Sequence, residues 1–236
     1  MKDFLSVAIQ IISRNFVKIL IICAICNPIF TLLSLFTVFF IPTYFLALVY
    51  QKARDYFLTG VEDFDIDLDI PKFYIEGFKI FISRVIMILP FSIFIILYIC
   101  GSLIVANILQ DQSQQNFQIV SIVFMISWVL LVIISMVISL SVTTINLLSI
   151  VGYSISGDII STVKNTYKIW FRNLLFSVLL FIIYLFGASA FSTLVLPVLC
   201  LSLSILYYLP TLLLDVFIFS FLGSKYKDLV VDKGLG

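Results

Sequence analysis

The sequence has no histidine and few charged residues. Asp, Glu, Lys and Arg make up 11% of its 236 residues, whereas 62% are hydrophobic and the mean hydropathy is +1.22. The absence of histidine excludes histidine-ligated haem and removes the commonest general base and metal ligand. A soluble globular domain is about half apolar and about a quarter charged, so this composition predicts a polytopic membrane protein.

Basic residues are absent from long stretches of the chain. All 14 Lys and Arg residues fall in four zones, at residues 2–18, 52–84, 164–172 and 225–233. The positive-inside rule places these zones in the cytoplasm. An even number of crossings then separates neighbouring zones. We therefore expect an all-α fold with six transmembrane helices in three hairpins, in the cell (inner, cytoplasmic) membrane, with both termini cytoplasmic.

Each hairpin is expected to follow an amphipathic helix that lies on the cytoplasmic membrane surface. Residues 1–15, 71–83 and 159–171 place polar and apolar side chains on opposite helix faces. On the third, we expect Tyr167, Trp170 and Phe171 in lipid. A single integral membrane domain results, in three parts. Residues 1–55 hold the first helix and hairpin, residues 56–150 an acidic linker with the second pair, and residues 151–236 the third pair and a cytoplasmic tail.

The predicted crossings differ in how clearly the sequence defines them. Residues 16–50 are too long for one helix and slightly short for two, so full or partial insertion of the first hairpin stays open, with a turn near Asn27-Pro28 or before Pro42. The later crossings are expected at residues 84–109 with a kink at Pro90, and then at 117–153, 172–190 and 194–222.

Three arginines occupy similar junctions between a predicted surface helix and a crossing. Arg14, Arg84 and Arg172 align when IQIISRNFVKIL, FKIFISRVIMIL and YKIWFRNLLFSV are set side by side. Two interpretations stay open: a threefold internal repeat, or independent basic anchors at the membrane interface. Trp170 is predicted to be a further interfacial anchor, because tryptophan favours that layer.

The segment before Pro71 is acidic. Asp65, Asp67, Asp69 and Glu76 match the first, third, fifth and twelfth positions of a calcium-binding loop, but Ile70 stands where that loop needs glycine. We therefore expect a solvated loop, with no metal site. Pro71 is expected in the first turn of the helix that follows, where proline is well tolerated.

Cysteine chemistry is not expected. Cys23 and Cys26 form a CxxC motif, but they and the other two cysteines, Cys100 and Cys200, all lie in apolar runs. A thiol in an apolar environment has little thiolate character. Packing is the interpretation we favour.

Asp215 is the one acid well inside an apolar segment, and we pair it with Asn146 as a candidate intramembrane polar site. An ionised carboxylate in the middle of a bilayer costs about 2.5–3.5 kcal/mol, so such residues often serve ion or proton coupling or pair with a partner. The alternative is that Asp215 lies near enough to the inner interface to reach water.

The block from Ile41 to Leu89 resembles an uncharacterised family of small prokaryotic membrane proteins, the domain of unknown function numbered 4013. Residues 222–227, near the end of the chain, are similar to that family's closing pattern. The resemblance implies a multi-pass membrane fold and no activity or cofactor. The residues that carry it are Pro42 to Tyr44, Lys52, Arg54, the acidic run, Ile70-Pro71, Phe73, Gly77-Phe78-Lys79 and LGSKYK at residues 222–227.

No nucleotide loop, nucleophile elbow, metal cluster or carboxylate pair is present in the sequence. We therefore expect a protein that is not an enzyme, has no cofactor and acts through assembly with lipid, a protein partner or copies of itself, without nucleic acid. One alternative is the permease subunit of an ABC-type exporter that works with a separate ATPase docked in the 51–84 region. An intramembrane enzyme would require Asp215 and Asn146 to share a cavity.

Overall fold

The computed structural model describes residues 3–26, 34–111, 117–172, 178–179, 182 and 205–227. These residues are almost entirely helical, and no strand occurs among them. The all-α prediction is therefore confirmed. The helices are α1 (Phe4–Ile25), α2 (Ser34–Thr59), α3 (Ile70–Asp111), α4 (Phe117–Ser156), α5 (Ile159–Arg172) and α7 (Ile205–Lys225).

Three of the described helices are long and apolar enough to cross a membrane. They span Phe4–Ile25, Ile70–Ile104 and Met125–Ser156, fewer than the six crossings expected. Most of the predicted fifth crossing and the first part of the sixth lie outside the described residues, at residues 173–177, 180–181 and 183–204. The structure thus supports a membrane protein with several apolar helices.

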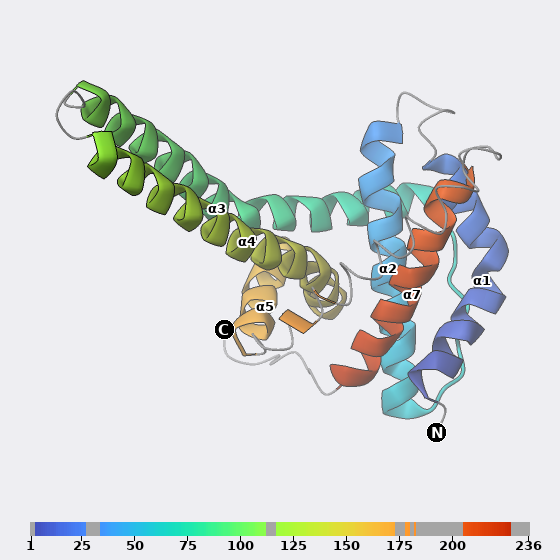
Figure 1. Cartoon of the computed structure of the whole chain (residues 1–236). Coiled ribbons are helices and arrows are strands. Elements are labelled where there is room, and N and C mark those ends of the chain that lie inside the picture. Colours follow the sequence, from blue (N-terminus) through green and yellow to red (C-terminus); the bar gives the residue numbers. More distant parts are fainter. Residues whose placement is uncertain are drawn as a thin grey trace.

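Two bodies make up the described structure (Figure 1). Helices α1, α2 and α7 form a bundle, in which α7 packs against both of the others. Helix α3 packs across α2, bends away from the bundle and pairs with α4 in a long projecting arm. Helix α5 lies at the base of this arm and contacts both α3 and α4. Pro90 lies inside α3 and accounts for the bend, because proline breaks the helical hydrogen-bond ladder.

Helix boundaries follow local signals in the sequence. Helix α3 begins at Ile70 with Pro71 in its first turn, as predicted, and the Asp69 carboxylate accepts the Lys72 backbone N–H at 3.3 Å. The break before α5 is a single turn at Gly157, where φ is +68°, and α4 runs on to Ser156. Pro42 lies inside α2, so the first hairpin does not turn at that proline.

Two glycines allow close helix crossings. A Cβ at Gly77 on α3 would lie 2.1 Å from the Phe40 carbonyl oxygen on α2, and the Phe40 ring packs against Tyr74, Phe78 and Phe81. A Cβ at Gly223 on α7 would lie 2.8 Å from the Cβ of Ala53 on α2. Both glycines are therefore required where α2 meets its neighbours.

Candidate functional site

Arg84 is the centre of a polar cluster at the junction of the bundle and the arm. Its Nε donates to Ser149 Oγ at 2.9 Å, its Nη2 to the Asn146 carbonyl oxygen at 3.0 Å, and its Nη1 to Thr43 Oγ1 at 3.4 Å. Ser149 and Thr43 are buried and Arg84 is half-buried. One guanidinium thus ties α3 to both α2 and α4, whereas the sequence predicted an anchor directed at lipid headgroups.

Asp215 lies on α7, half-buried. Burial disfavours its ionised form, and the positive charge of Arg84 offsets part of that effect through space. Asn146 takes part through its backbone carbonyl. Arg84 therefore contacts Asn146 directly and acts on Asp215 only through its charge.

A second polar contact joins α3 to α4 on the bundle side of Arg84. The Tyr153 hydroxyl donates to Glu76 Oε2, and Lys79 Nζ lies 2.9 Å from Glu76 Oε1. In the sequence Glu76 stands on the polar face of a predicted amphipathic helix and at the twelfth position of the calcium-loop match. Tyr153 gave no signal, because its partner lies 77 residues away in the chain.

Asn15 on α1 is hydrogen-bonded to the acidic linker, residues 60–69. The Asn15 side chain is fully buried. Its Nδ2 donates to the Phe64 carbonyl oxygen at 2.7 Å, and its Oδ1 accepts the Ile66 backbone N–H at 3.0 Å. Phe64 and Ile66 are buried while the aspartates that alternate with them are exposed. The predicted solvated loop is right for the acids and wrong for the residues between them.

Ion pairs border this attachment. Lys18 Nζ lies 2.5 Å from Asp65 Oδ1, and Lys52 Nζ lies 2.5 Å from Asp63 Oδ2. Hydrogen bonds from Lys52 and Lys18 lower the pKa of the Asp63 and Asp65 carboxyls, respectively. Arg14 adds a hydrogen bond of 3.0 Å from Nη1 to the Glu62 carbonyl oxygen. The linker is therefore an extended segment held along one side of α1.

The other candidate residues that the structure describes lie in the extended linker, in the core or at the surface. The aspartates considered for calcium are spread along this extended segment, and the described residues include no cluster of three or more potential metal ligands. Cys23 and Cys26 are buried in the core, Cys100 is exposed on the arm, and Cys200 lies outside the described residues. Arg14 and Arg172 are exposed.

Helix α5 packs against α3 beside Pro90. The Tyr167 hydroxyl donates to the Met87 carbonyl oxygen at 2.9 Å, and the Trp170 ring lies 6.4 Å, centroid to centroid, from Phe91. Pro90 has no N–H to donate to the Ile86 carbonyl four residues before it, and Tyr167 donates to the next carbonyl in the same turn, that of Met87. Tyr167 and Trp170, which were expected to face lipid, contact α3 and are half-buried.

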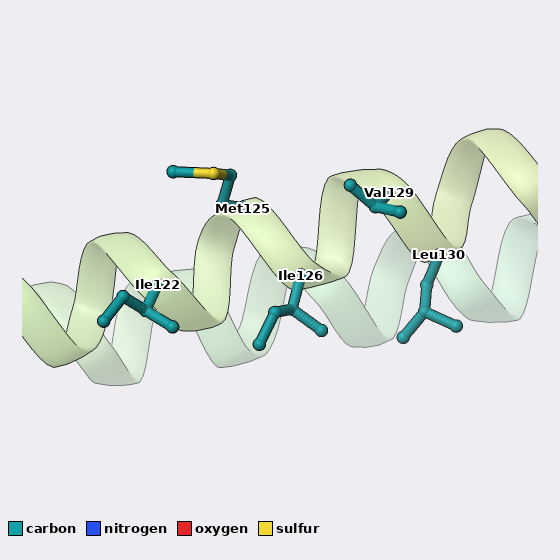
Figure 2. Close-up of a pocket in the computed structure, with 5 residues that line it drawn as sticks. All are labelled: Ile122, Met125, Ile126, Val129 and Leu130. Atoms are coloured by element: carbon teal, nitrogen blue, oxygen red, sulfur yellow. The ribbon is translucent and has the colours of Figure 1, made fainter.

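The arm carries a nearly unbroken apolar surface. Between Arg84 and Asp158 the only charged residue is Asp111. Apolar side chains are exposed along residues 85–104 of α3 and 122–137 of α4. A shallow groove on α4 is lined by five of them, Ile122, Met125, Ile126, Val129 and Leu130 (Figure 2). Among the side chains that the structure describes there, none that lines the groove is polar.

No protein-family model, curated protein or solved structure matches the chain. The resemblance noted in the sequence therefore stays a prediction. Two of its glycines, Gly77 and Gly223, lie at the tight helix crossings described above.

Proposed function

We propose that this chain is a non-enzymatic, multi-pass protein of the cytoplasmic membrane that acts through assembly with lipid or a partner protein. Both termini are cytoplasmic in this proposal, and the chain crosses six times, as the basic zones predict. Membership of the family of domain 4013 is part of the same proposal.

The exposed apolar arm is the observation that carries this proposal. Residues 85–111 of α3 extend for about 40 Å at 1.5 Å per residue, which exceeds the bilayer hydrocarbon thickness of about 30 Å. Exposed apolar surface of this extent is typical of a membrane or protein interaction site. Lipid chains along the arm would remove that surface from water.

Fluorescence quenching tests whether the arm enters lipid. The chain has two tryptophans, and Trp128 on α4 is exposed on the arm. In a Trp170→Phe variant reconstituted into vesicles, lipids brominated on their acyl chains should quench Trp128 strongly. Water-soluble quenchers, which reach no deeper than the headgroup layer, should have little effect on Trp128. Emission that responds only to aqueous quenchers would contradict the proposal.

The permease subunit is the second candidate function. The first turns of α3 pack against α2 through Phe73 and Gly77 but leave Tyr74, Ile75 and Phe78 exposed. This face is a suitable surface for an ATPase to dock. Purification in mild detergent followed by mass spectrometry tests the idea. A stoichiometric ATPase supports a permease, and its absence leaves the first proposal.

A further inference from the structure

Helix α5 presents a mixed basic and apolar stripe on the side away from the protein. Thr162, Thr166 and Ile169 form its buried side. At 100° per residue, the opposite side carries exposed residues within an arc of about 80°. These are Ile160, Lys164, Lys168 and Phe171.

The charge on this stripe has one sign. Helix α5 contains no acidic residue, and Arg172 in its last turn adds a third positive charge beside the two lysines. Ile160 and Phe171 are 79% and 65% exposed. Apolar side chains between lysines are typical of helices that lie in an anionic headgroup layer.

The position of α5 gives independent support. Tyr167 and Trp170 hold the helix against Met87 and Phe91, just where the exposed apolar surface of the arm begins. Figure 1 shows α5 at the base of the arm. If the arm lies in the bilayer, the outward stripe of α5 lies at headgroup depth.

We propose that the outward stripe of α5 binds anionic phospholipid headgroups of the cytoplasmic leaflet. This inference rests on the proposed insertion of the arm. Lys164 and Lys168 contact lipid phosphates, while Ile160 and Phe171 insert between the headgroups. Helix α5 then fixes the depth at which the arm enters the membrane.

Lipid retention by the full chain tests this inference. The protein is purified in mild detergent with equal amounts of phosphatidylglycerol and phosphatidylcholine, and the bound lipid is measured by native mass spectrometry. Wild type should prefer phosphatidylglycerol, and Lys164→Gln/Lys168→Gln should reduce that preference by about thirtyfold, since each of the two basic residues near an anionic surface contributes about 1 kcal/mol.

Matched variants separate charge from folding. Lys164→Arg/Lys168→Arg should keep the preference, because the charge is retained. Lys72→Gln/Lys227→Gln removes two positive charges outside α5 and should also keep it. Circular dichroism should show unchanged helix content in each variant. Equal retention of both lipids by wild type, or an unchanged preference in the double glutamine variant, would overturn the inference.

The Trp128 measurement keeps the two proposals distinct. Quenching of Trp128 by brominated chains together with an unchanged lipid preference overturns the role of α5 and leaves the membrane proposal intact. Absence of that quenching overturns both, because α5 is then not at headgroup depth.

Discussion

The Asn15 side chain accepts the backbone N–H of Ile66 at 3.0 Å, across 51 residues of sequence. The same side chain donates to the Phe64 carbonyl oxygen, so one buried amide satisfies two backbone groups of the linker. Few polar groups can replace a primary amide here, because the site needs a donor and an acceptor side by side.

Replacement of Asn15 should therefore release the linker. In Asn15→Ala the Phe64 carbonyl loses the Asn15 donor and the Ile66 N–H keeps only its bond to Asp65 Oδ1 at 3.1 Å. A buried group left unsatisfied costs about 1–3 kcal/mol. We expect faster proteolytic cleavage between Gly60 and Asp69 and a lower unfolding temperature in detergent. Ser13→Ala is the control, because Ser13 is exposed and bonds only within its own helix. Equal cleavage rates in Asn15→Ala and wild type would contradict the role of Asn15.

The ion pairs should make linker attachment sensitive to acid. Lys52 and Lys18 hold the pKa values of Asp63 and Asp65 below their ordinary range. Their contribution to attachment is therefore complete above the unfolded-state pKa of about 4 and is lost as the pH falls through the lowered values. Linker cleavage by an acid-stable protease should rise over that window. In Asp63→Asn/Asp65→Asn the increase should be absent and cleavage already faster at neutral pH.

Gly77 should tolerate no side chain. A Cβ there would lie 2.1 Å from the Phe40 carbonyl oxygen, so Gly77→Ala must separate α2 from α3. Overpacking of this kind costs about 1–3 kcal/mol. Gly101→Ala is the matched control, because nothing lies within 4 Å of a Cβ at that helical position. Thermal unfolding should show a clear loss for Gly77→Ala and little change or a gain for Gly101→Ala.

Arg84 and Asp215 should be energetically coupled. Arg84→Gln removes the positive charge that favours the Asp215 carboxylate and the bonds to Thr43, Asn146 and Ser149. Asp215→Asn removes only the negative charge. In a double-mutant cycle followed by unfolding, we expect the double variant to be less destabilised than the sum of the singles. Strict additivity would show that the two charges act independently.

Local features could be predicted from the sequence, and long-range contacts could not. Pro71, Pro90 and Gly157 mark a helix start, a bend and a break, and each acts through its own backbone chemistry. The partners of Arg84 lie 41 to 65 residues away, and no local pattern encodes them. The alternation of Phe64, Ile66 and Leu68 with aspartates did carry a signal, because a period of two indicates an extended segment with one buried side.

Helix α5 shows the same limit. The sequence shows that α5 is amphipathic, but it does not show which of its side chains face α3. In the sequence Tyr167 and Trp170 look like lipid-facing residues, because the bend of α3 beside them is a feature of the structure alone. A bend places an acceptor, the Met87 carbonyl, where a tyrosine can reach it.

The attachment of the linker restricts what α1 can do in a membrane. Linker and helix run side by side from Arg14 to Lys18, and the linker brings four exposed aspartates with it. If α1 moved into hydrocarbon with the linker attached, these carboxylates would enter the bilayer as well. Each ionised carboxylate near the bilayer centre would cost about 2.5–3.5 kcal/mol of insertion free energy. Acyl chains and the linker therefore exclude each other from this side of α1. We therefore expect the Arg14–Lys18 stretch of α1 to stay at the aqueous boundary while the linker is attached.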